Sequence, residues 1–113
     1  GMIKGFPKRG EIYWVKLDPI VGTEIAKTRP CLVVSNNAGN EISSRVIVAP
    51  ITSSVKKVLP FEVPISLSDK KGKLLLDQIR SVDKVRLSGN ISRVDSETMD
   101  LVDEALKLVL ALD

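Results

Sequence analysis

The strongest constraint on the fold is a pair of near-continuous apolar runs of strand length. Pro30–Ser35 (PCLVVS) and Arg45–Ile51 (RVIVAPI) are rich in β-branched residues, and turn-forming segments follow them at Asn36–Asn40 and Thr52–Ser54. Runs of this length and composition are typical of buried strands. Both are therefore predicted to be central strands of a sheet.

Further strands are predicted around these two runs. Glu11–Leu17 alternates polar and apolar residues, and Phe61–Ile65 does so with flanking and internal prolines, which marks an edge or bulged strand. A turn at Lys71–Lys73 is predicted to precede another strand at Asp77–Val82. The remaining predicted strand pieces are Val85–Leu87 and Gly89–Val94.

The hydrophobic period changes near the end of the chain. Asp95 is a candidate N-cap, and after it Met99, Val102, Leu106, Val109 and Leu110 recur at helical spacing. One amphipathic helix of about four turns is predicted, with Asp100, Asp103 and Glu104 facing water. A chain that is mainly β with a C-terminal α-helix indicates a small, strongly curved sheet or half-open barrel.

Composition limits the classes of function. A chain of 113 residues with 43% apolar and 27% charged residues fits one globular domain, here residues 2–113, with Gly1 interpreted as a scar from a removed tag. No apolar run approaches the roughly 20 residues of a membrane span, and no signal peptide is recognised, so a cytoplasmic protein without membrane association is expected. The chain has one cysteine and no histidine, which excludes an internal disulfide, a serine triad and a histidine-dependent ribonuclease site. No metal site or cofactor is predicted.

The charge is distributed unevenly along the chain. Residues 1–94 carry 16 Lys and Arg against 8 Asp and Glu, whereas residues 95–113 carry one Lys against 6 acids. A basic body with a separate acidic segment fits binding to a polyanion or to an acidic protein segment. The alternative is that the lysines only keep the protein soluble.

Polar residues cluster where the predicted strands begin or end, which is where sites are built on a rigid scaffold. A connection of 11 residues, Asp18–Thr28, precedes the first apolar run, and an Arg-Pro pair closes it. A hairpin between two strands needs only a few residues, so the length of this connection indicates a function. The polar residues at such positions are Arg29, Ser35, Asn36, Thr52, Gln78 and Arg80.

Five segments in order carry a resemblance to a known family. They read RGEIYWVKLDPIVGTEIAKTRPCLVVSN, VIVAPIT, FEVPI, LLLDQIRSVDKVRL and VDEALKL. Together they resemble the MazF/PemK family of toxin ribonucleases over nearly the whole chain. The resemblance implies a compact barrel related to CcdB toxins and SH3-like barrels, a homodimer, metal-independent cleavage of single-stranded RNA, and a cognate MazE-like antitoxin.

The resemblance also implies roles for individual residues. Arg29 matches the catalytic arginine, Thr52 matches the threonine beside it, and Glu24 matches a glutamate common in the first loop. A guanidinium group and a hydroxyl can stabilise the extra negative charge of a phosphorane. Because a guanidinium group holds its proton tightly, we expect Arg29 to stabilise charge and Glu24 to be the general base. As an alternative, Glu24 is a solvated loop acid.

Other residues are predicted to hold RNA or to pack. The expected RNA contacts are Gln78, Arg80, Asn36, Lys27, Lys56 and Lys57, although each lysine or arginine could instead be an ordinary surface charge. Trp14 and Tyr13 could stack on bases, but Trp14 is expected to serve mainly in packing, and Cys31 is expected in the core.

The sequence departs from the family at one place that bears on loop mobility and substrate preference, and two other classes of function stay open. Family members often carry a glycine before the Arg-Pro pair, whereas Ile25–Thr28 fills that place here. A CcdB-like gyrase poison and an SH3-like module that binds nucleic acid or peptide remain alternatives to the ribonuclease.

Overall fold

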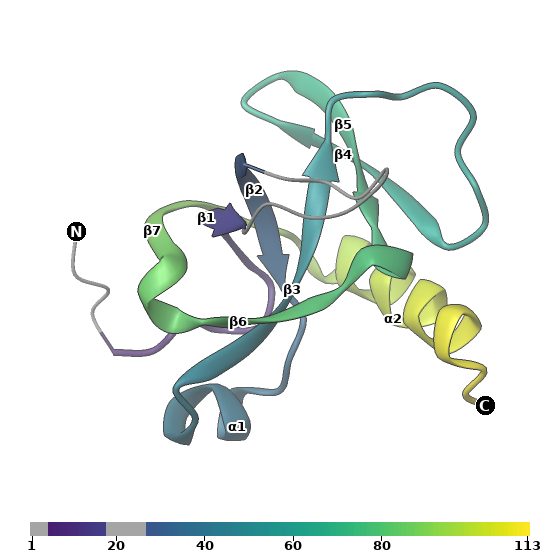
Figure 1. Ribbon diagram of the computed structural model, residues 1–113. Coiled ribbons are helices and arrows are strands. Elements are labelled where there is room, and N and C mark those ends of the chain that lie inside the picture. Colours follow the sequence, from purple (N-terminus) through teal and green to yellow (C-terminus); the bar gives the residue numbers. More distant parts are fainter. Residues whose placement is uncertain (1–4, 18–26) are drawn as a thin grey trace.

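The computed structural model describes residues 5–17 and 27–113, and these form a curled antiparallel sheet closed by a C-terminal helix (Figure 1). Within this part of the chain the strand order is β4-β5-β3-β2-β1-β7, and β6 pairs with β3 beside this path. The strands are β1 (Glu11–Leu17), β2 (Lys27–Val33), β3 (Arg45–Thr52), β4 (Glu62–Leu67), β5 (Lys70–Leu75), β6 (Arg80–Asp83) and β7 (Leu87–Arg93). The helices are α1 (Asn37–Ile42) and α2 (Ser96–Leu110), with short 3-10 turns η1 (Leu76–Gln78) and η2 (Lys84–Arg86).

The sheet buries apolar side chains on both faces. One core lies under α2 and includes Leu32, Leu74 and Val102, which are fully buried. The other includes Cys31, Val33 and Val48 on the opposite face. Because β2 and β3 contribute to both cores, their sequences are apolar almost without alternation, as predicted for central strands.

The C-terminal helix is held at its start and along its length. The Asp95 carboxylate accepts the Thr98 amide at 2.8 Å, which is the predicted N-cap. Arg9 donates to the Val34 carbonyl at 2.9 Å and forms an ion pair with Asp103. The prediction that Asp103 faces water is therefore wrong in part, because Arg9 uses it to fasten α2 to the sheet.

Several predicted boundaries are wrong for local reasons. Lys71–Lys73 is not a turn but lies inside β5, because the hairpin turns at Ser68 and Asp69, both with positive φ. The segment Asn36–Asn40 begins a helix rather than a simple turn, since the Asn36 side chain caps α1 by accepting from the Gly39 amide at 2.7 Å. The strand predicted at Asp77–Val82 is shortened at its start by η1.

Among the described residues, none of the helices combines the length and the apolar character needed to cross a membrane.

Candidate active site

The site begins where the pairing of β2 with β3 ends. β3 pairs with β2 from Cys31–Pro50 to Val33–Val48, and on its other edge Ile51 and Thr52 pair with β5. Neither Pro30 nor Pro50 has an amide hydrogen to extend the first ladder. The two strands therefore part beyond this point, and Figure 1 shows β3 continuing toward the β4–β5 hairpin.

Arg29 and Thr52 both lie at this opening and line the same hollow. In the register of the pairs Cys31–Pro50, Leu32–Ala49 and Val33–Val48, they are the corresponding positions two residues beyond the last pair. Side chains alternate with a period of two, so both residues project from the sheet face of Cys31 and Pro50. The Thr52 hydroxyl oxygen accepts the Ser54 amide at 3.2 Å, and this bond does not use the hydroxyl proton. The structure thus brings together the two residues predicted to carry the chemistry.

Gly72 allows β5 to approach β3 closely at Thr52. A Cβ added at Gly72 would lie 2.8 Å from the Thr52 carbonyl oxygen and 3.3 Å from the Ile51 side chain. Only glycine permits β5 to approach β3 this closely. The prediction of a turn at Gly72 is therefore wrong, and this role is not visible in the sequence.

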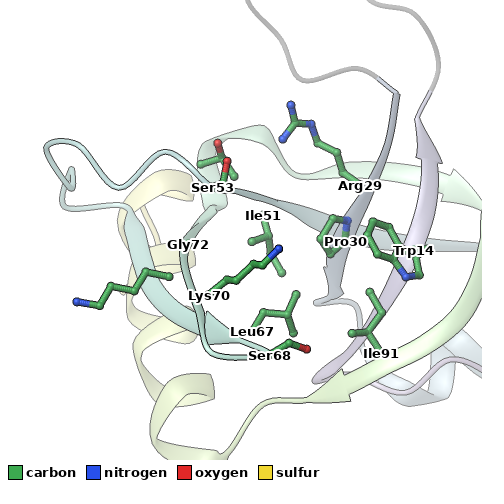
Figure 2. A pocket seen from close by; sticks show the side chains of 12 residues that line it. Trp14, Arg29, Pro30, Ile51, Ser53, Leu67, Ser68, Lys70, Gly72 and Ile91 are labelled. Carbon is green, nitrogen blue, oxygen red and sulfur yellow. The ribbon is translucent and has the colours of Figure 1, made fainter.

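One hollow opens beside Arg29 and Thr52, and we call it the Trp14 hollow. Its volume is about 320 Å³. Figure 2 shows Trp14, Pro30 and Ile91 on one side of it and Ile51 and Leu67 facing them, with Arg29 at the upper edge. The full lining is Trp14, Arg29, Pro30, Ile51, Thr52, Ser53, Leu67, Ser68, Lys70, Lys71, Gly72 and Ile91.

Trp14 is exposed in this hollow. Trp14 is 45% exposed, although both sequence neighbours, Tyr13 and Val15, are buried. The expectation that Trp14 serves mainly in packing is therefore wrong. Tyr13 packs in the core and donates its hydroxyl to Glu11 at 2.9 Å, so it is not available for stacking. An apolar floor with a cationic rim is suited to a nucleobase next to a phosphate.

A second hollow of about 460 Å³ contains Gln78 and Arg80, and we call it the Gln78 hollow. Leu17 and Pro50 also line it, so it lies on the sheet face from which Arg29 and Thr52 project. Burial raises the pKa of the Cys31 thiol to about 12, and the charges of Arg80 and Arg29 act in the opposite direction. Both guanidinium groups therefore lie near the same buried thiol. Cys31 itself is a core residue, as predicted.

The remaining predicted residues are distributed unevenly. Lys27 opens β2 with a positive φ of 70°, and Lys56 and Lys57 lie exposed on the loop after Thr52. Asn36 lies beyond the opposite end of β2, where its amide caps α1, so it is not grouped with Arg29. Glu24 lies outside the described residues.

A buried lysine that the sequence does not predict lies beside the site. Lys73 is only 8% exposed and pairs in register with Thr52. The sequence of β5, KKGKLL, carries no local signal that separates Lys73 from the exposed Lys70 and Lys71. Among the described residues, no three His, Cys, Asp or Glu side chains gather as metal ligands.

Comparison with known proteins agrees with this geometry. Residues 8–110 match the family described as PemK-like, MazF-like toxin of type II toxin-antitoxin system. The chain belongs to this family. Endoribonuclease EndoA of Bacillus subtilis (strain 168) is 44% identical over 110 residues, which cover 93% of this chain and 95% of EndoA. The MazF-like chain is an endoribonuclease, and the gyrase-poison and interaction-module alternatives are not favoured.

Solved structures carry the same MazF-like fold. MazF from Deinococcus radiodurans superposes with a TM-score of 0.81 at 29% identity and covers 95% of this chain and 98% of its own. A mycobacterial endoribonuclease solved with its cognate antitoxin has a TM-score of 0.80 at 29% identity, with 95% and 97% coverage. The predicted curled sheet with a C-terminal helix is confirmed.

Proposed function

We propose that this MazF-like endoribonuclease cleaves single-stranded RNA by internal transesterification at Arg29 and Thr52, without a metal ion. The observation that supports this most strongly is that both residues line one hollow where the pairing of β2 with β3 ends. A ribose 2′-hydroxyl attacks the adjacent phosphorus, and the bond from phosphorus to the 5′-oxygen breaks. The products are a 2′,3′-cyclic phosphate and a 5′-hydroxyl.

Arg29 and Thr52 act on the charge that develops during this step. The phosphorane carries more negative charge than the phosphodiester, so donors held in place beforehand stabilise it more than the substrate. The guanidinium fork of Arg29 matches two phosphate oxygens, and the hydroxyl of Thr52 supplies a further hydrogen bond. The proton acceptor proposed from the sequence is Glu24.

The two hollows provide for binding on either side of the reacting phosphate. Trp14 offers an apolar face to one base, and the Gln78 amide can read the edge of another. Arg80, Lys27, Lys56 and Lys57 are proposed to hold the phosphate backbone. We propose that the substrate is messenger RNA in the cytoplasm, so that cleavage inhibits translation and growth.

Regulation by an antitoxin is part of the same proposal. A mycobacterial relative was solved with its cognate antitoxin, and MazE–MazF of Deinococcus radiodurans was solved at 26% identity to this chain. We propose a MazE-like partner whose acidic segment competes with RNA for the region around Arg29. Equal antitoxin affinity with and without bound RNA would contradict competition.

We also propose a homodimer. Three apolar side chains, Ile42, Ile47 and Val85, are exposed by 86%, 39% and 88% on the monomer. Light scattering that gives the mass of one chain at micromolar concentration would contradict this.

The chemical step is tested with a long single-stranded RNA in EDTA. Mapping of the ends identifies the cut sites, and a short RNA with one such site is then made with a single 2′-deoxyribose before the scissile phosphate. We expect cyclic phosphate ends on the first RNA and no cleavage of the second. Cleavage of the deoxy-substituted RNA would refute attack by the 2′-hydroxyl.

A further inference from the structure

The loop that follows Thr52 is fastened by a buried ammonium group. This loop, residues 53–61, connects β3 to β4 and is the long excursion beside the β4–β5 hairpin in Figure 1. The Nζ atom of Lys73 donates to the Lys56 carbonyl at 3.3 Å and to the Lys57 carbonyl at 3.1 Å. It also donates to the Glu62 carboxylate at 2.8 Å. All three hydrogens of the ammonium group are therefore used.

Glu62 completes the fastening at the far end of the loop. Its Oε1 atom accepts the Leu59 amide at 2.9 Å as well as the Lys73 ammonium, and its own amide donates to the Leu59 carbonyl at 2.9 Å. The side chains of Lys73 and Glu62 are only 10% and 8% exposed. A buried pair with this many hydrogen bonds holds one geometry, because any rearrangement would leave a charge unpaired.

The fastening point is opposite the candidate catalytic threonine. Thr52 pairs in register with Lys73, so the chain leaves β3 at Thr52 and is tied by Lys56 and Lys57 to the residue that faces Thr52. The ties are made to backbone carbonyls, while the Lys56 and Lys57 residues remain exposed. Their ammonium groups are thereby carried on a fixed backbone close to the reacting centre.

We infer that Lys73, with Glu62, is a positioning residue that presents Lys56 and Lys57 to the phosphates of the RNA. The inference rests on the proposed function, in which these two lysines hold the RNA backbone. Lys73 does not touch the substrate and acts through the loop. A preordered pair of cations binds phosphates without the entropy cost of ordering the loop at each encounter.

The test measures the salt dependence of binding, which a purely structural role would not change. The probe is a mixed-sequence single-stranded RNA of 30 nucleotides with 2′-O-methyl riboses, which cannot undergo transesterification. The variants are K73M/E62L, K56M/K57M and the combination of all four substitutions. K73M/E62L replaces the buried pair by apolar side chains, a change that folds often tolerate. Lys107→Met is the control, because Lys107 lies exposed on α2 and pairs only loosely with Glu104, at 3.5 Å.

Two lost phosphate contacts predict a defined result. Each contact to single-stranded nucleic acid contributes about 0.7 to the slope of log affinity against log salt, so the slope should fall by about 1.4. Near 0.15 M salt this corresponds to roughly tenfold weaker binding. The same loss is expected for K56M/K57M and for the fourfold variant, because Lys73 acts through those two lysines. Lys107→Met should keep the wild-type slope.

Other outcomes overturn the inference. A wild-type slope in K73M/E62L beside a reduced slope in K56M/K57M would reduce Lys73 to a stabilising residue. A fourfold variant clearly weaker than K56M/K57M would give Lys73 an independent role. If K73M/E62L does not fold, K73Q/E62Q serves instead, because it leaves no buried charge, and the shorter glutamine has two N–H donors where the ammonium group has three, so the slope should fall in the same direction. Failure of the wild type to cut unmodified RNA would instead refute the proposed function, and the inference with it.

Discussion

Replacing Lys73 by methionine removes the ammonium group that neutralises the buried Glu62 carboxylate. The methionine retains most of the apolar stem of the lysine, so the main change is the loss of charge and of three hydrogen bonds. Breaking a buried ion pair on one side costs about 3–5 kcal/mol, because the other charge stays buried without compensation. Glu62 keeps the Leu59 amide as a donor, which favours the lower end, about 3 kcal/mol.

This loss of stability converts into a measurable change in melting temperature. With an unfolding entropy of about 2.1 cal/mol/K per residue, a chain of 113 residues loses roughly 4 °C per kcal/mol. Lys73→Met is therefore expected to melt roughly 12 °C below the wild type at pH 7. K73M/E62L should recover most of this difference, since no buried charge remains.

The pH dependence of the folding stability provides a second, independent test. Burial acts to raise the pKa of Glu62, but the hydrogen bonds from Leu59 and Lys73 and the charge of Lys73 outweigh it and lower the pKa below 4.5. A depressed folded-state pKa means that the stabilisation is complete above 4.5 and is lost as the pH falls through the folded-state value. In Lys73→Met burial is unopposed by the ammonium group, so the pKa of Glu62 should rise and acid should relieve the defect.

Thermal unfolding followed by circular dichroism at pH 7 and pH 4 tests both the loss of stability and its relief in acid. The gap in melting temperature between wild type and Lys73→Met should be wide at pH 7 and narrower at pH 4. The exposed control Lys107→Met should stay within about 0.5 kcal/mol of wild type at both. A Lys73→Met variant as stable as wild type at pH 7, or a gap that widens toward pH 4, would refute the reasoning.

Three further predictions concern the site and the core. Thr52→Val should lower kcat by roughly a hundredfold with little change in KM, because its hydroxyl acts on the transition state; a loss below twofold in single-turnover cleavage would contradict this role. Gly72→Ala must widen a 2.8 Å contact with the Thr52 carbonyl toward the ordinary 3.4 Å, and the shift should cost roughly tenfold or more in kcat, so unchanged kcat would disprove the constraint. The Cys31 thiol, fully buried and with its pKa raised to about 12, should resist Ellman's reagent at pH 8 until urea is added; immediate labelling of the native protein would exclude this burial.

The central strands and the last helix could be predicted from the sequence because local patterns determine them. Pro30–Ser35 and Arg45–Ile51 are apolar throughout and could not be stable outside a core. The helix start at Asp95 is predictable because its side chain caps the helix by accepting the amide of Thr98, three residues later. Such features depend on neighbours in the chain, so a single sequence reveals them.

The features that the sequence does not predict depend on contacts between residues far apart in the sequence. Gly72 was assigned to a turn because glycine between two lysines is typical of loops, whereas its reason is the approach of Thr52 from β3. The role of Lys73 is not visible in the sequence, since its partners are two carbonyls of the loop before β4 and the Glu62 carboxylate at the start of β4. Packing is predicted for Trp14 because aromatic residues make up only 4% of the chain, and only the pairing of β1 with β2 reveals the hollow in front of it.

The candidate site residues come from the family resemblance, and their catalytic roles stay predictions. For Arg29 and Thr52, the register of β2 and β3 supplies the physical reason why both lie at one opening. Nothing local to Arg29 indicates that Thr52 will line the same hollow, because 22 residues separate them in the sequence.

The most direct test of the account compares single-turnover RNA cleavage in EDTA by the wild type, Arg29→Ala and Arg93→Ala. Arg93 is an exposed arginine at the far end of the same sheet, opposite Glu11, and is a matched control. We predict discrete cuts with cyclic phosphate ends for the wild type and Arg93→Ala, and a loss of at least a hundredfold for Arg29→Ala. Equal cleavage by Arg29→Ala, or cleavage by the wild type only after a metal ion is added, would contradict the proposed centre.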